Sequence, residues 1–282
     1  MWSFEVERLP AREAQAFARR VEELGFPVLW IPESAVSKEV FTQATLLLSA
    51  TERLVVATGI ANIWARDAVA MRNGERALAE AFPRRFLLGL GVSHEPAVRR
   101  RGGTYKRQLQ HMRGYLDAMD AARYSGPEPA HPPDRVLAAL GPKMLDLARE
   151  RTAGAHPYFV PVEHTAFARQ RLGADPLLAW EQAVCLETTP SAAREIAKRH
   201  MAGYLRLDNY ANNLRRLGWT AADLAGPTDA LVDAVVAHGD AAALAERVRA
   251  HHAAGADHVC LQVLGDRSPR VLEELSRSVL LR

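Results

Sequence analysis

The sequence has little cysteine. Of its 282 residues only Cys185 and Cys260 are cysteines, and both lie inside apolar runs, "AVCLE" and "HVCLQV". Two cysteines are too few for a disulfide framework, and neither stands at metal-ligand spacing from a histidine or a second cysteine. We expect reduced thiols that pack as small hydrophobic side chains, no metal site, and a cytoplasmic protein.

Long hydrophobic runs are absent as well. No stretch reaches the roughly 18 consecutive apolar residues of a membrane-spanning helix, and the start "MWSFEVERLP" lacks the order of a secretory signal. Charge of one sign is also not in excess, since 36 basic against 33 acidic residues give a net charge of +3. That balance is too weak to predict a nucleic-acid partner but suits an anionic small ligand. We expect no membrane partner.

Linker-like and low-complexity segments are missing too, so we expect residues 1–282 to form a single domain. What the sequence has instead is an alternation of short apolar runs with helical stretches. Short, continuous apolar runs, typical of parallel strands buried on both faces, recur between helical stretches. These runs are residues 28–31, 54–59, 86–91, 135–140, 155–160, 183–187 and 258–263.

Strands and helices in alternation predict a parallel α/β fold. Trp2 to Phe4 supply a further short or truncated first strand, and an eightfold (β/α)8 TIM barrel needs about 250 residues, which this length accommodates. A doubly wound sheet stays open as an alternative. Residues 203–237 predict a helical insertion before the last strand. A short first strand leaves edges that oligomerisation or another segment would cover, and we expect a homo-oligomer, in the simplest case a dimer.

One apolar run ends in an unusual group of residues: 86–96 read "FLLGLGVSHEP". The stretch fails as a dinucleotide-binding G-x-G-x-x-G turn, because His94 stands where the third glycine belongs and no helix is expected before Gln108. In a barrel, however, the active site lies at the carboxyl ends of the strands. The stretch then presents backbone amides and a hydroxyl to a ligand, or it is merely a strand end with an exposed histidine.

The motif "GLGVSH", taken with "ATERLVVATGIANIWARD" and "LAALGPKMLDLARERTAGAHPY", resembles the luciferase-like monooxygenase superfamily. The likeness is greatest to the branch of oxidoreductases that use the deazaflavin coenzyme F420, and it extends from about Phe17 to about Val263. It implies an eightfold barrel with a flavin or deazaflavin across the carboxyl face. It also implies a bulge with a non-proline cis peptide after the third strand, at Gly59 and Ile60.

The resemblance further implies which residues bind the cofactor. They come from the bulge and from the ends of the fourth and fifth strands: Gly59, Ile60, Ala61, Asn62, Gly91, Val92, Ser93, His94, Leu140, Gly141, Pro142 and Lys143. Gly141 and Pro142 also open a helix, whose N-terminal amides favour an anion. Lys143 either adds a positive charge there or is an ordinary exposed helix residue.

Two residues are candidates for catalysis. His94 occupies a position where some deazaflavin-dependent relatives have a glutamate that acts as an acid, and a histidine is able to exchange a proton near neutral pH. Glu33 matches an acidic position of the same relatives, and it is either a second acid or a partner for an arginine. The basic residues Arg99–Arg101, Lys106 and Arg107 form a solvated run or contact the anionic tail of the cofactor.

The resemblance thus predicts an oxidoreductase that transfers a hydride between coenzyme F420 and an unidentified small organic substrate. One alternative is an FMN-dependent monooxygenase that uses oxygen and receives reduced flavin from a partner reductase. Another is a non-catalytic cofactor-binding barrel. The same fold accommodates both cofactors, and no residue decides between them. The short first strand favours the non-catalytic barrel, and the intact ends of the fourth and fifth strands argue against it.

Overall fold

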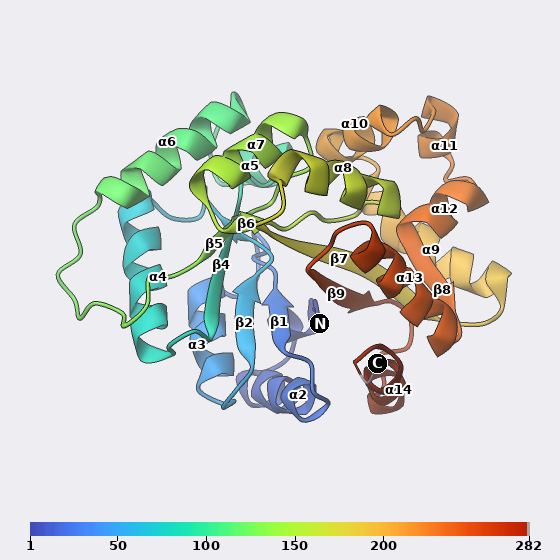
Figure 1. The fold of residues 1–282 in the computed structure, drawn as a ribbon, viewed down its shortest axis with the longest axis horizontal. Coiled ribbons are helices and arrows are strands. Elements are labelled where there is room, and N and C mark those ends of the chain that lie inside the picture. The colour runs from blue at the N-terminus through green and yellow to red at the C-terminus, as the bar shows by residue number, and fades with distance from the viewer. Residues whose placement is uncertain (281–282) are drawn as a thin grey trace.

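The computed structural model describes residues 1–280, in which parallel strands are surrounded by helices (Figure 1). Every ladder pairing between strands is parallel, in the order β1-β2-β4-β5-β6-β7, with β3 beside β4 and with β8 and β9 both beside β7. The strands are β1 (Val28–Ile31), β2 (Val55–Thr58), β3 (Ala61–Asn62), β4 (Phe86–Gly91), β5 (Arg135–Leu137), β6 (Gly154–Ala155), β7 (Leu177–Leu186), β8 (Val236–Gly239) and β9 (His258–Val263).

The helices follow the strands in turn, and several begin where the sequence places a cap. Asp67 and Asp240 accept hydrogen bonds from Ala70 and Ala243, as N-cap residues do. The helices are α1 (Glu5–Arg8), α2 (Ala11–Glu23), α3 (Val40–Leu48), α4 (Ala68–Ala81), α5 (Glu95–Arg100), α6 (Gln108–Ala121), α7 (Pro142–Arg151), α8 (Val162–Leu172), α9 (Pro190–Tyr204), α10 (Asp208–Arg216), α11 (Ala221–Ala225), α12 (Asp229–Val235), α13 (Ala241–Ala253) and α14 (Pro269–Val279).

Residues Met1–Ser3 lie between β9 and β1 and hydrogen-bond to both. The amide of Trp2 donates to Leu261 of β9 over 2.8 Å, and that of Ser3 donates to Trp30 of β1 over 3.1 Å. Met1–Ser3, β1, β2, β4, β5, β6, β7 and β9 therefore follow one another around a ring. This is the predicted (β/α)8 order.

The predicted insertion is helical. Residues 203–237 hold the end of α9, then α10, α11 and α12, and lead into β8 (Figure 1, orange). β8 pairs with the far end of β7, at Ala183–Leu186, and is thus additional to the ring. The insertion brings α10 over the carboxyl end of β4, as the hydrogen bond between His94 and Asn209 demonstrates.

The structure corrects three sequence expectations. A helix, α5, begins directly after His94, where none was expected before Gln108. Pro96 suits the first turn of a helix, and Glu95 pairs with Arg99 one turn later, so six residues suffice for a short helix. The strands predicted over 135–140 and 155–160 end at Leu137 and Ala155, because the chain beyond them turns over the end of the ring.

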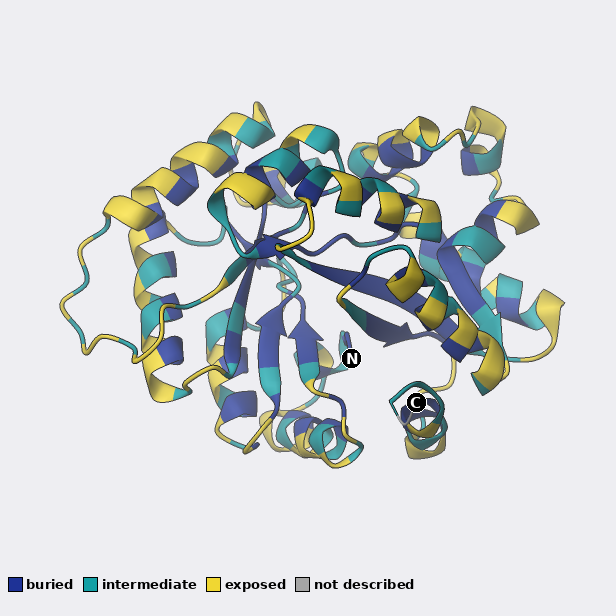
Figure 2. Cartoon of the chain, viewed as in Figure 1, coloured by how far each residue is buried: buried dark blue, intermediate teal, exposed yellow. Residues whose placement is uncertain are grey.

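The core has three apolar clusters, and the helices expose their outer faces (Figure 2). One cluster packs α9, α10 and α12 against Phe159 and β8. Another fills the space between strands and helices. A smaller cluster, which includes Trp2, Trp30, Ala57, Val136, Ala179 and Cys260, fills the ring itself. Both cysteines are buried and free, as predicted. Trp30 stacks on His156 with ring centroids 4.0 Å apart, so the interior of the ring also contains polar atoms.

The backbone of β2 passes very close to β4 at Gly89. A β-carbon at Gly89 would lie 2.0 Å from the carbonyl oxygen of Thr58, which is backbone and has little freedom to move. The hydroxyl of Thr58 also donates to the Gly89 carbonyl and accepts from its amide. Any side chain at Gly89 would force these strands apart.

We therefore expect Gly89→Ala to lower the free energy of unfolding by about 1–3 kcal/mol or more, since it overpacks a rigid site. Urea unfolding monitored by circular dichroism measures the change. Gly114→Ala is the matched control, because nothing lies within 4 Å of that β-carbon position in α6. Alanine there should stabilise the helix by about 0.5–1 kcal/mol. Equal stability of the two variants would contradict the close approach.

Candidate functional site

The carboxyl ends of the ring strands carry most of the residues predicted to form a site. The Gly59–Ile60 peptide bond is cis, as the resemblance implies. A β-carbon at Gly59 would lie 2.6 Å from the indole nitrogen of Trp2 and 3.1 Å from Nε2 of His156. A β-carbon at Gly91 would meet the side chain of Ile60 at 2.4 Å. Glycine thus leaves room for the indole of Trp2 at position 59 and for the side chain of Ile60 at position 91.

The turn after β4 exposes main-chain donors. Ser93 has a left-handed backbone, with φ at 59°. The carbonyls of Val92 and Ser93 accept hydrogen bonds from Trp64 and Tyr105, whereas their amides donate to no group within residues 1–280. Left-handed turns of this kind present amides to anionic or carbonyl ligands. The predicted role of these amides in ligand binding is therefore compatible with the structure.

His94 is held at this turn by the insertion. Its Nδ1 lies 3.1 Å from Oδ1 of Asn209, and its ring lies 5.3 Å from that of Tyr210, both residues of α10. Because an amide oxygen only accepts, Nδ1 carries the hydrogen and Nε2 is left as the acceptor. Burial lowers the pKa of His94, and the bond to Asn209 opposes this shift. At neutral pH the residue is consequently uncharged.

The turn after β5 lies at the start of α7. Gly141 is the N-cap residue and Pro142 the first helical residue, as predicted. Leu140 is half-buried and its carbonyl accepts from His164 over 2.9 Å. Lys143 is exposed, which agrees with an ordinary helix surface position. A cation that the sequence did not indicate also lies at this turn: Nη2 of Arg216 in α10 would be 3.7 Å from a β-carbon at Gly141.

Glu33, the second candidate acid, is part of an ion pair. Its side chain is 3% exposed and contacts the guanidinium of Arg66 through both oxygens. Oε2 also accepts from the amide of Asn62 over 2.7 Å. A carboxylate with these partners links the bulge to the end of β1. The structure therefore favours the alternative in which Glu33 pairs with an arginine over the one in which it acts as an acid. Ala61 and Asn62 themselves are buried and pair with Leu90 and Gly91 of β4.

A cluster of aromatic side chains, absent from the sequence-based prediction, covers the end of the ring. Its members are Tyr158 and Phe159 after β6, Tyr204 of α9 and Tyr210 of α10, and each ring lies within 6.1 Å of another. The hydroxyl of Tyr158 donates to Gln262 of β9 and hydrogen-bonds to Tyr204 over 2.7 Å. We call this group the aromatic cover.

Beneath the aromatic cover lies a buried carboxyl group, that of Glu181 in β7. The residue is 2% exposed, and its Oε2 accepts from the amide of Phe159 over 3.2 Å. Its Oε1 has no partner among the described residues. Burial raises the pKa of Glu181 to about 8. The sequence signal that marks it is one acidic residue in the apolar run "LLAWEQAVCL".

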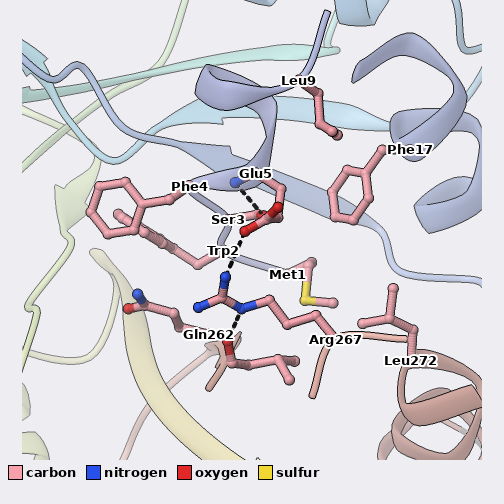
Figure 3. Close-up of a pocket in the computed structure, with 11 residues that line it drawn as sticks. Met1, Trp2, Ser3, Phe4, Glu5, Leu9, Phe17, Gln262, Arg267 and Leu272 are labelled. Carbon is pink, nitrogen blue, oxygen red and sulfur yellow. Dashed lines mark hydrogen bonds and ion pairs between the residues drawn. The ribbon is translucent and has the colours of Figure 1, made fainter. Parts of the chain in front are cut away.

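The structure has two notable concavities, and the first shares Trp2 and Gln262 with the surroundings of Tyr158 in the aromatic cover. One has a volume of about 130 Å³ and lies between the first residues of the chain and β9, where Arg267 donates to Glu5 (Figure 3). It is smaller than the roughly 300–1,000 Å³ typical of ligand pockets. The other, of about 510 Å³, is an open depression on α6 that includes Lys106, Arg107 and His111. Residues 1–280 hold no cluster of three potential metal ligands, and none of their helices is long and apolar enough to span a bilayer.

The ring of parallel strands, with polar residues and glycines gathered at its carboxyl ends, defines an enzyme of the α/β-barrel class. Residues 4–258 match the sequence model of the luciferase-like monooxygenase family, and the chain belongs to that family. It is accordingly an oxidoreductase.

Individual relatives are distant. The chain is 27% identical over 190 residues to the 5,10-methylenetetrahydromethanopterin reductase of Methanolobus tindarius, an alignment that covers 59% of this chain and 58% of that protein. The coenzyme F420-dependent tetrahydromethanopterin reductase of Methanopyrus kandleri superposes with a TM-score of 0.77, 13% identity and coverage of 100% and 97% of the two chains. The FMN-bound oxygenating part of 3,6-diketocamphane monooxygenase from Pseudomonas putida has a TM-score of 0.68, 16% identity and coverage of 97% and 94%.

The pairing of Glu33 with Arg66 is open to a direct test. Glu33→Gln removes one charge and leaves the guanidinium, 10% exposed, with Glu39 as its remaining counterion. We expect a loss of about 1–3 kcal/mol in the free energy of unfolding, because a hydrogen-bonded buried carboxylate is lost while part of the charge compensation stays.

Glu246→Gln is the control, because its pair with Arg249 is exposed and worth at most about 1 kcal/mol. Chemical denaturation of both variants gives the comparison. A stable Glu33→Gln protein with impaired turnover would restore the acid role.

Proposed function

We propose that the protein transfers a hydride between coenzyme F420 and a small organic substrate. The observation that carries this proposal is the turn at Val92–His94, whose two unpaired amides and neutral imidazole lie beside the Gly59–Ile60 bulge. The relatives named for coenzyme F420 support the deazaflavin. The substrate stays unspecified, because the chain aligns with little more than half of the curated relative.

The residues present fit such a cofactor. Gly89 lets the backbones of β2 and β4 approach, and Gly59 and Gly91 leave room for the side chains of Trp2 and Ile60. The amides of Val92 and Ser93 are available to a carbonyl or an anionic group, and the start of α7 with Arg216 suits a phosphate. Lys106 and Arg107, which line the depression on α6, supply positive charge that would suit an anionic tail.

The cofactor, when bound, supplies the hydride. The chain itself positions the reacting groups and transfers protons to or from the substrate. The bulge and the turn after β4 hold the reacting groups together, which is where most of the rate gain of a hydride transfer arises. His94, neutral and with Nε2 free to accept, is suited to take a proton from the substrate or return one to it. The aromatic cover excludes water from the end of the ring.

The alternative in which FMN is the cofactor also has support. The FMN-bound monooxygenase from Pseudomonas putida has the same fold, and luciferase-like folds under 25% identity do not discriminate between cofactors. In that case a reductase would supply reduced flavin. In either case we expect one domain over residues 1–282, a cytoplasmic location and a homodimer.

Titration of the purified protein with coenzyme F420 and with FMN, followed by fluorescence or calorimetry, tests the proposal. We expect the deazaflavin to bind with a submicromolar dissociation constant and FMN to bind more weakly. Tight binding of FMN alone would overturn the deazaflavin proposal. Binding of neither would favour the non-catalytic barrel.

His94→Ala tests the proton-transfer role. Loss of a positioned acid or base costs about 10²–10⁴-fold in rate, whereas cofactor affinity should change little because the backbone supplies the neighbouring contacts. Single-turnover kinetics and the same titration measure the two effects. Asn209→Ala is the matched variant, since it frees the ring without removing it, and it should lie between wild type and His94→Ala. Equal loss of affinity and rate in His94→Ala would remove the residue from this role.

A further inference from the structure

Glu181 has the environment of a functional group rather than a structural one. It points into the ring, because Glu181 and Ala179 lie on the same face of β7 and Ala179 belongs to the interior cluster. Its side chain is buried, and no arginine or lysine pairs with it within residues 1–280. A buried carboxyl is normally paired or fully hydrogen-bonded, because desolvation of an isolated charge is costly.

Other buried carboxyls in the chain illustrate the contrast. Glu75 of α4 is fully buried and bonds through both oxygens to Arg135. Glu33 is bound in the same way by Arg66. Glu181 instead receives one amide hydrogen bond on Oε2 and leaves Oε1 unpartnered. An unused, buried polar atom of this kind indicates that a partner is supplied from elsewhere.

A continuous set of contacts connects Glu181 to the candidate site. Its Oε2 bonds to the amide of Phe159, the Phe159 ring packs edge-to-face on Tyr210 at 5.3 Å, and Tyr210 packs on His94 at 5.3 Å. These contacts connect the carboxyl, on the inner face of β7, to His94 at the turn after β4 through the rings of Phe159 and Tyr210.

The groups that face Glu181 carry no positive charge. They are Tyr158 after β6, Tyr204 of α9, Tyr210 of α10 and Cys260 of β9. Burial raises the pKa of each of these groups, so they are neutral near pH 7. Glu181 is thus surrounded by uncharged groups that favour its protonated form. Pairs of titratable groups whose pKa values are displaced in opposite directions often divide the acid and base roles of a site.

We propose that Glu181, in place of His94, is the proton donor of the site and that it acts on the carbonyl oxygen of a ketone or aldehyde substrate. The proposal rests on the proposed function. As the hydride from the reduced cofactor forms a C–H bond at the carbonyl carbon, the π electron pair moves to oxygen. That pair forms the new O–H bond with the Oε1 proton, and Glu181 becomes a carboxylate. The cofactor is oxidised by two electrons and the carbonyl is reduced to an alcohol.

The protonation state is tested without any cofactor. Infrared difference spectra of wild type and Glu181→Gln should contain the carbonyl stretch of a protonated carboxylic acid at pH 7, and the band should disappear as the pH rises through about 8.

The thermal midpoint of unfolding should also change with the protonation of Glu181. Because the folded pKa lies above the ordinary value of 4.5, the folded state retains the proton longer, and stability falls from about pH 5 to about pH 8. Glu181→Gln should flatten this fall. A band for ionised carboxylate at pH 7 would overturn the proposal.

The donor role is tested by single-turnover oxidation of reduced coenzyme F420 with a panel of small ketones and aldehydes. We expect the wild-type rate to fall as the pH rises through about 8, and Glu181→Gln to be slower by about 10²-fold or more with no such fall. Glu181→Asp should restore part of the rate. Unchanged rates in Glu181→Gln would contradict the proposal. So would a lack of oxidation by every carbonyl compound while the deazaflavin binds, whereas failure of the deazaflavin to bind would refute the proposed function itself.

Glu75→Gln is the matched control, because it also removes a buried carboxyl but lies in α4, remote from the aromatic cover. We expect it to lower the thermal midpoint and to retain the wild-type pH dependence of the rate. If both variants lost that dependence, Glu181 would have a structural role only.

Discussion

The close approach of β2 and the following bulge to β4 is the constraint on which the site depends. Thr58 and Gly89 exchange two hydrogen bonds across the strands, and Ile60 occupies the space that a side chain at Gly91 would need. Gly89 is therefore required by the neighbouring backbone, and Gly91 by the side chain of Ile60, before any ligand is considered. The same contact brings the bulge beside the turn that ends at His94, so packing and candidate chemistry have one origin.

Much of the fold was predictable from the sequence. The apolar runs at 28–31, 86–91 and 258–263 coincide with β1, β4 and β9, because a strand buried on both faces leaves an uninterrupted apolar pattern. The runs at 135–140 and 155–160 are equally apolar yet form only three-residue and two-residue strands. Beyond these strands Phe159 packs against α9 and α10, whereas Ala139 and Val160 lie in the main core cluster, and hydropathy does not distinguish such burial from burial in a sheet.

The site was predictable only in part. The resemblance indicated the bulge, the turn at Gly91–His94 and the start of α7, which are local in sequence. It did not indicate Asn209, which contacts His94 across 115 positions of the chain, or the role of Arg66 as the counterion of Glu33. Glu181 could have been noticed as an acidic residue in an apolar run, but its lack of a counterion depends on side chains from four other elements.

The central claim is that a deazaflavin binds at the carboxyl end of the ring, between the Gly59–Ile60 bulge and the turn at Val92–His94. A crystal structure of the protein with oxidised coenzyme F420 tests it most directly. The account predicts electron density for the ring system against this backbone, with the amides of Val92 and Ser93 within hydrogen-bonding distance of the ligand. Density for the ring system in the depression on α6, or at the cavity beside β9, would contradict it.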